Sequence, residues 1–308
     1  RGQLMKKQKT VSIKAKLLGV IIPVVIAIVV VLVVAAYQIS AGTIKKYSQN
    51  LLQSSVENQA SQIEAWLNEN LASFQMAKTI IEDLKPSDEE LKTILDGYYG
   101  YNSNYPEGLY VADSTGQLIT ASESTKKESD VTNSTWYKEG LTRVNMAVGS
   151  AYQNADGVNV ISASGILNDG SDKVRVISAD MTLDRIAIIV NSFIEMNDAE
   201  AFLVDKTSGV ILANRDSSLI SQTLGAEGQS HFYQLTAEKA AEKDYNFATL
   251  DGNMTVFQEV DGTNWLLISY IPTSIVLSDL TQLRNIMIVI SVICIASVSY
   301  THLRAPRD

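Results

Sequence analysis

The sequence predicts an α+β fold in which one long helix leads into two similar α+β modules, with an apolar helix able to cross a membrane near each end. Three observations predict this fold. Two apolar segments without charged side chains lie near the ends of the 308-residue chain. A stretch with the apolar spacing of a helix follows the first segment. A pattern of short strands and glycine turns then occurs twice.

The first apolar segment, residues 17–37, is expected to be a transmembrane helix. A helix rises about 1.5 Å per residue, so these uncharged residues cross a hydrocarbon core of about 30 Å. Residues 1–16 contain six basic side chains and no acidic one, which predicts a cytoplasmic N-terminus. A cleaved signal peptide is the alternative, but the run is long for one and Ala35-Ala36-Tyr37 is a poor cleavage site.

The second apolar segment, residues 285–300, is expected to be a truncated second transmembrane helix. Residues 301–308 lack a helical apolar pattern and are expected to be a tail foreign to the natural protein, as are residues 1–4 before Met5. Residues 38–283 are then extracytoplasmic, and the chain is expected to be a multi-pass protein of the cell membrane.

A helix is predicted over residues 38–85, where no glycine or proline occurs between Thr43 and Lys85. Its apolar residues recur in alternating steps of three and four, which places them on one helical face. They are Leu52, Val56, Ala60, Ile63, Leu67, Leu71, Phe74, Ala77, Ile81 and Leu84. Pro86 then predicts a stop, with Ser87 or Asp88 as the cap of a new helix. The long helix is expected to act as a stalk from the membrane or as one side of a helical bundle.

A weak internal repeat predicts two consecutive α+β modules, the first over about residues 98–185 and the second over about 195–275. Each copy has an apolar strand, a turn that begins with aspartate and contains glycine, and a second strand, which is the pattern of a β-hairpin. The two hairpins are Leu109–Ile119 and Phe202–Leu212. Each copy also ends with an apolar strand, Val174–Met181 in the first and Trp265–Ile271 in the second.

Charge and composition exclude several functions. The net charge is −9, and residues 17–283 carry 16 basic against 33 acidic side chains, so a nucleic-acid partner is not expected. The single cysteine, Cys294, cannot form a disulfide within the chain, and His231 and His302 do not have metal-ligand spacing. No phosphate-binding glycine motif or serine nucleophile elbow occurs. The protein is therefore expected to be no enzyme and to hold no cofactor or metal.

From about Tyr37 to Leu283 the chain resembles a double Cache (dCache) sensor domain. The order of helix, module and module carries the resemblance, together with the segment Asn264–Pro272, which is similar to the family's final strand. The resemblance implies a long helix packed along two PAS-like modules, the first distal and the second proximal to the membrane, flanked by transmembrane helices. The basic head that leads into the first apolar segment is similar to the start of a methyl-accepting chemotaxis protein.

The resemblance also implies a ligand site in the distal module. Amino-acid-binding members of the family hold their ligand with a tyrosine, an Arg-x-Trp-Tyr motif, and a later tyrosine and aspartate. The residues of this chain that match are Trp136, Tyr137, Tyr152 and Asp180. Ser134 stands at the arginine position, and no tyrosine occurs from Lys127 to Thr135. Tyr110, in the first strand of the module, completes the candidate set.

These residue types suit an ammonium group better than a carboxylate. Aromatic faces attract a cation, and a carboxylate gives it a charge-assisted hydrogen bond. A ligand carboxylate would call for a bidentate arginine, which is absent at the motif position. The predicted ligand is therefore an amine or is amino-acid-like. The alternative is that Trp136 and Tyr137 are core aromatic residues and Asp180 is a turn or capping residue.

The predicted function is the sensor part of a bacterial transmembrane chemoreceptor, which would transmit a helix displacement across the membrane. The alternative is the same sensor attached to a histidine kinase or a diguanylate cyclase. An anchored binding or adhesion protein is a third possibility, but a second transmembrane helix argues against it. The expected partners are a small-molecule ligand, the membrane, a second copy of the chain in a homodimer, and cytoplasmic signalling proteins.

Overall fold

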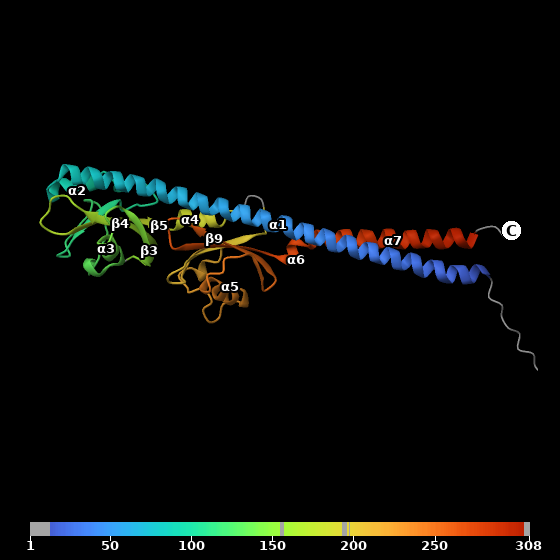
Figure 1. The fold of residues 1–308 in the computed structure, drawn as a ribbon. Coiled ribbons are helices and arrows are strands. Elements are labelled where there is room, and N and C mark those ends of the chain that lie inside the picture. Colours follow the sequence, from blue (N-terminus) through green and yellow to red (C-terminus); the bar gives the residue numbers. More distant parts are fainter. Residues whose placement is uncertain (1–12, 155–156, 193–195, 197, 305–308) are drawn as a thin grey trace, which may run out of the picture. The chain divides into compact units, whose positions relative to one another are not determined.

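The computed structural model describes residues 13–154, 157–192, 196 and 198–304 (Figure 1). The chain forms two compact units, one from Arg1–Ser48 with Thr273–Asp308 and the other from Gln49–Pro272. Helix α1 spans Ile13–Leu84, so the first predicted transmembrane helix and the predicted long helix are one continuous helix. The expectations for residues 1–12 and 305–308 lie outside the described residues.

The unit made from the chain ends contains the apolar helices. Two helices in the described part of the chain are long and apolar enough to cross a membrane, α1 and α7. Helix α7 spans Ser278–Arg304 and follows the short helix α6, Thr273–Val276. The second transmembrane helix was expected over residues 285–300. Helix α7 begins before that range and extends into residues 301–304, which were expected to belong to a foreign tail. The first helix-breaking residue of that segment in the sequence is Pro306, which disfavours helix only from the residue before it.

The apolar face predicted for the long helix is confirmed. Its buried members are Leu52, Val56, Ala60, Ile63, Leu67, Phe74, Ala77 and Ile81. Leu71 is half-buried and Leu84 is exposed. Leu84 is the last helical residue, and the chain turns away there because Lys85 has a positive φ of 48°. Ser87 caps the next helix in a capping box with Glu90, as predicted.

The distal module is a five-stranded antiparallel sheet with the strand order β2-β1-β5-β4-β3. The predicted hairpin is confirmed, because β1 pairs with β2, and the closing strand β5 then pairs with β1. The elements are α2 Asp88–Asp96, β1 Leu109–Asp113, β2 Leu118–Ile119, a 3-10 helix Val131–Asn133, α3 Thr135–Gly140, β3 Ala147–Gln153, β4 Asn159–Leu167 and β5 Arg175–Thr182.

The proximal module repeats this topology with the strand order β7-β6-β10-β9-β8. Its hairpin, β6 with β7, and its closing strand, β10 beside β6, are also as predicted. The elements are α4 Asp184–Val190, β6 Glu200–Asp205, β7 Ile211–Asn214, a 3-10 helix Ser217–Leu219, α5 His231–Ala241, β8 Ala248–Leu250, β9 Asn253–Val260 and β10 Trp265–Pro272. The predicted α+β fold with two tandem modules is therefore confirmed.

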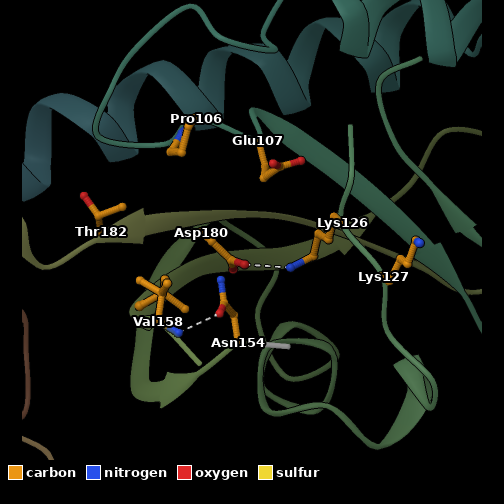
Figure 2. A pocket seen from close by; sticks show the side chains of 9 residues that line it. Pro106, Glu107, Lys126, Lys127, Asn154, Val158, Asp180 and Thr182 are labelled. Carbon is orange, nitrogen blue, oxygen red and sulfur yellow. Dashed lines mark hydrogen bonds and ion pairs between the residues drawn. The ribbon is translucent and has the colours of Figure 1, made fainter. Parts of the chain in front are cut away.

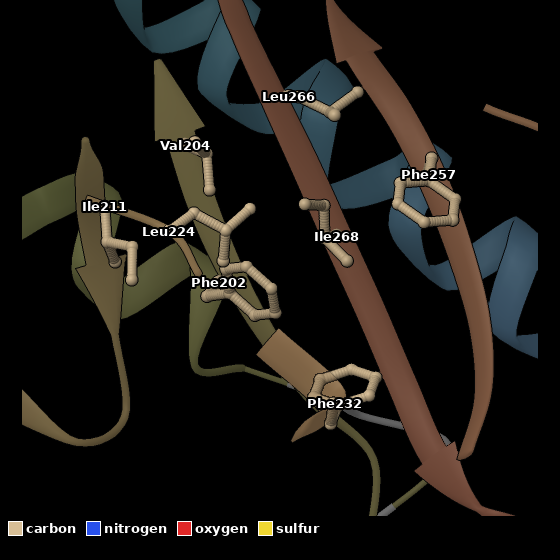
Figure 3. Packing of buried hydrophobic residues seen from close by; sticks show 8 residues of the cluster. All are labelled: Phe202, Val204, Ile211, Leu224, Phe232, Phe257, Leu266 and Ile268. Atoms are coloured by element: carbon tan, nitrogen blue, oxygen red, sulfur yellow. The ribbon is translucent and has the colours of Figure 1, made fainter. Parts of the chain in front are cut away.

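An apolar core fills one face of the proximal sheet (Figure 3). Phe202 on β6 packs edge-on against Phe232 on α5, with ring centroids 6.5 Å apart. The buried residues of this cluster are Phe202, Val204, Ile211, Leu224, Phe232, Phe257, Leu266 and Ile268. Burying such side chains supplies most of the favourable free energy of the module.

A buried glutamine on α1 binds the end of the helix that joins the two modules. Gln59 Nε2 donates to the backbone oxygens of Ile189, Val190 and Ser192 at 3.1, 3.2 and 2.8 Å. These carbonyls lie at or just beyond the C-terminus of α4, where a helix leaves its last carbonyls without internal partners. The long helix therefore contacts the connection between the modules through the side-chain amide of Gln59.

The aspartate that begins the distal hairpin turn organises it through its carboxylate. Asp113 Oδ1 accepts from the backbone N–H groups of Thr115 and Gln117 at 2.8 and 3.1 Å, and Lys173 Nζ lies 2.5 Å from Oδ2. Burial raises the pKa of Asp113, but these bonds to the charged form outweigh it and hold the pKa at about 2.

We expect Asp113→Asn to destabilise the protein at neutral pH by about 1–2 kcal/mol, a figure reduced for the exposure of Lys173. Because the folded pKa lies below the ordinary value of 3.8, the stabilisation is present above about pH 4 and is lost as the pH falls toward 2. Thermal unfolding of both proteins between pH 2.5 and 7 measures this. A difference in stability that does not narrow as the pH falls would contradict the assignment.

Candidate functional site

Polar side chains from four strands of the distal sheet meet on one face. Tyr110 on β1 lies opposite Ser178 on β5, and Ser162 on β4 lies opposite Asp180 on β5. Residues two apart in a strand share a face, so Tyr110, Ser162 and Asp180 point to the same side. Tyr152 on β3 reaches the same point, since its hydroxyl lies 2.9 Å from Ser162 Oγ. The register of the sheet therefore assembles the cluster.

The carboxylate of Asp180 is the centre of this cluster. Its Oδ1 accepts hydrogen bonds from the hydroxyls of Tyr110, Tyr152 and Ser162, the last two at 2.9 and 2.5 Å. Burial, reinforced by the charge of Asp180, raises the pKa of both tyrosines. Both hydroxyls therefore stay protonated and can donate to the carboxylate, which is itself buried.

The second oxygen of Asp180 is taken by an ammonium group of the chain itself. Lys126 Nζ lies 2.6 Å from Asp180 Oδ2, and the two side chains are 10% and 8% exposed. The same ammonium lies over the ring of Tyr110, 4.2 Å from its centroid. Figure 2 shows Lys126 reaching from its loop toward Asp180 on the strand. The arrangement is a cation site with a carboxylate on one side and an aromatic face on another.

Hydrogen bonds along the loop after β2 hold Lys126 in this position. The backbone N–H and hydroxyl of Ser122 donate to the carboxylate of Asp96 at 2.5 and 3.0 Å. Ser124 Oγ donates to Glu107 at 2.5 Å and accepts from the backbone N–H of Lys126 at 3.2 Å. The lysine is therefore presented by an anchored loop.

A cavity of about 220 Å³ lies beside the ion pair, with Lys126 and Asp180 in its wall (Figure 2). Its other lining residues are Pro106, Glu107, Lys127, Asn154, Val158, Val160 and Thr182. A second cavity of about 260 Å³ also has Lys126, Lys127 and Asn154 in its wall. Concave, partly apolar spaces with a few convergent polar groups are typical of small-molecule sites.

The family comparison agrees with this architecture. The family model of the Cache domain, dCache_1, matches residues 36–280. The chain belongs to the Cache-domain family. No curated protein sequence matches the chain.

Solved structures with the same Cache fold are ligand-binding domains of sensors. The ligand-binding domain of Mlp24 with asparagine has a TM-score of 0.62 at 17% identity, covering 76% of this chain and 98% of that one. The ligand-binding domain of the Pseudomonas fluorescens chemoreceptor CtaA in complex with L-isoleucine has a TM-score of 0.60 at 19% identity, covering 78% of this chain and 98% of that one. The ligand-binding domain of the Pseudomonas aeruginosa PAO1 amino acid chemoreceptor PctC in complex with GABA has a TM-score of 0.59 at 20% identity, covering 73% of this chain and 99% of that one. At these identities the likeness shows the shared fold.

Three of the five residues predicted for the Cache ligand site, Tyr110, Trp136 and Tyr137, belong to one buried cluster. Trp136 is fully buried on α3, edge-on to Tyr110 with ring centroids 4.9 Å apart. Its Nε1 donates to Glu128 Oε2 at 2.9 Å, and burial raises the pKa of that carboxyl. Tyr137 packs edge-on against Trp136 at 5.8 Å. Trp136, Tyr137 and Tyr110 do not line either of the two cavities, and the role of Trp136 and Tyr137 in ligand binding stays a prediction.

The structure brings the predicted residues Tyr110 and Tyr152 together at the carboxylate of Asp180, which was also predicted. Their role in ligand binding stays a prediction. The sequence analysis missed Lys126 and Ser162. The only sequence signal for the lysine was the pair Lys126-Lys127 in the loop before the Trp-Tyr motif. Ser134, at the position of the family's arginine, lines the second cavity, whose positive charges come from that pair.

Proposed function

We propose that this Cache protein is the extracytoplasmic ligand-sensing part of a bacterial transmembrane chemoreceptor. Its distal module would bind a small molecule that carries an ammonium group, an amine or an amino acid. The observation that carries the proposal is the cation site around Asp180 at the wall of a cavity. Tyr110 supplies a ring face there, the hydroxyls of Tyr110 and Tyr152 are donors, and the carboxylate supplies the charge that an ammonium needs.

The proximal module supports the choice of the distal one. Since the strand order is the same, positions can be compared by counting from the aspartate turns along the paired strands. Tyr270 stands where the distal module has Asp180, and Phe202 stands where it has Tyr110. These two rings lie 6.2 Å apart and Tyr270 packs on Phe232 at 4.5 Å. Aromatic core thus replaces the polar cluster at the equivalent positions.

The ligands of the related structures also support the proposal. Asparagine, L-isoleucine and GABA are bound by domains with the same fold. Each of these compounds carries both an ammonium and a carboxylate group.

Calorimetry on the full chain in nanodiscs tests the proposed function, with the common L-amino acids, GABA and short alkylamines as titrants. We expect saturable binding of at least one compound with an ammonium group and loss of that binding in Asp180→Asn. Asp244→Asn is the matched control, because Asp244 pairs with Lys239 in the proximal module and is more exposed. Binding that survives Asp180→Asn, or no binding by any of these compounds, would contradict the proposal.

Membrane insertion and signal output are part of the same proposal. The two apolar helices α1 and α7 would both cross the membrane, with residues 38–283 outside and the chain acting as a homodimer. Ligand binding would shift a two-state equilibrium of the long helix and reach cytoplasmic signalling partners. The alternative is that the same sensor belongs to a histidine kinase or a diguanylate cyclase. Cysteine crosslinking between the membrane helices, with and without ligand, would test the helix displacement.

A further inference from the structure

The ammonium group of Lys126 occupies the position in the proposed site where the ammonium group of a ligand was expected. Its primary ammonium has the carboxylate of Asp180 at 2.6 Å and the ring of Tyr110 at 4.2 Å. An alkylammonium ligand would seek the same two partners for the same reasons. The two ammonium groups therefore compete for one place.

The position of Lys126 is built into the fold. Its side chain is only 10% exposed, and its loop is fixed through Ser122 to Asp96 and through Ser124 to Glu107. The side chain also belongs to the walls of the two cavities of about 220 and 260 Å³ described above. Turning it away from Asp180 would remove a wall that the two cavities share, so displacement of the lysine would also enlarge the space for a ligand.

We propose that Lys126 is the specificity-determining residue of this cavity, because its ammonium occupies the cation site at Asp180 and a ligand must displace it. The proposal rests on the proposed function and names the class of ligand. A zwitterion offers its own carboxylate to the displaced lysine. A simple amine brings no carboxylate, so the displaced ammonium is left with Glu107 and Glu128 in the cavity walls, whose carboxyl groups already accept from Ser124 and Trp136. Pairing there is less favourable than pairing with the free carboxylate of a zwitterion. The occupied site therefore selects amino acids over simple amines.

Butylammonium and L-norvaline are each titrated into the wild type and into variants of Lys126 to test this. Butylammonium is L-norvaline without its carboxylate, so the two differ only in the group that would receive Lys126. Thermal shift and calorimetry are run on the full chain in nanodiscs with butylammonium chloride, against sodium chloride at equal ionic strength. Tetramethylammonium chloride serves as a cation without N–H donors. The proteins are the wild type, Lys126→Ala, Lys126→Ala/Asp180→Asn, and the control Lys239→Ala, whose lysine pairs with Asp244 and lies over the ring of Phe257.

We expect the wild type and Lys239→Ala to show no saturable response to butylammonium. Lys126→Ala should bind it at least tenfold more tightly than the wild type, and the double variant should lose that binding. Lys126→Met, which keeps most of the packing of the lysine stem, replaces Lys126→Ala if the alanine variant does not fold.

Equal binding of butylammonium by the wild type and the Lys126 variants would overturn the proposal, as would a response that survives Asp180→Asn. This readout does not depend on the natural ligand. If no amino acid binds the wild type but the Lys126 variant gains butylammonium binding, the occupied cation site stands and the proposed ligand class falls. If amino acids bind the wild type but the Lys126 variant does not gain butylammonium binding, the proposed ligand class stands and the occupied cation site falls.

Discussion

Asp180→Asn is expected to destabilise the sensor by about 3 kcal/mol, because it leaves Lys126 as a buried ammonium without its carboxylate. Asparagine keeps the volume and still accepts from the hydroxyls of Tyr110 and Tyr152, so the loss reports the charge. For a unit of this size, about 3 kcal/mol lowers Tm by roughly 6–12 °C. Thermal unfolding of the full chain in nanodiscs measures the change.

The double variant Lys126→Met/Asp180→Asn separates the ion pair from other effects. Removing both charges is expected to be less harmful than Asp180→Asn alone, because an apolar side chain replaces an unpaired ammonium. Asp244→Asn breaks the pair with Lys239, in which the carboxylate side chain is 42% exposed, and is expected to lower Tm much less than Asp180→Asn does. A double variant whose loss equals the sum of the two single losses would show that Lys126 and Asp180 are not coupled.

Arg175→Met is expected to have a similarly large effect, a loss of about 3–5 kcal/mol in the free energy of unfolding. Arg175 begins the closing strand β5 and is buried. One guanidinium nitrogen donates to Asp169 at 2.8 Å and another to Asp88, the first residue of α2. The substitution leaves Asp169, which is also buried, without its cation, and it detaches the start of α2 from the sheet.

Arg215→Met is the control for this substitution. Arg215 pairs with Glu200 at 3.2 Å, but its side chain is 70% exposed, so the expected change is within about 0.5 kcal/mol. Urea unfolding monitored by circular dichroism compares the two variants. Equal losses for Arg175→Met and Arg215→Met would show that burial does not set the strength of the Arg175 interactions.

Local patterns determined much of the architecture. The spacing of three and four from Leu52 to Ile81 identified the buried face of α1, because a helix repeats every 3.6 residues. The recurring strand, aspartate and glycine pattern identified both hairpins, because Asp113 and Asp205 each bond to backbone N–H groups within their own turns. These interactions span only a few residues, so a single sequence contains them.

Local sequence patterns predicted the candidate site only in part. Tyr110, Tyr152 and Asp180 come together through strand register, and the family resemblance pointed to Tyr152 and Asp180. The burial of Trp136 and the pairing of Lys126 with Asp180, 54 residues away in the chain, depend on the path of a loop and on how α3 packs on the sheet. The sequence by itself determined the helix and the two modules, and with the family resemblance it predicted an acidic, aromatic site for an ammonium. Only the tertiary structure decided whose ammonium lies there, because a long-range ion pair leaves no periodic signal in a sequence.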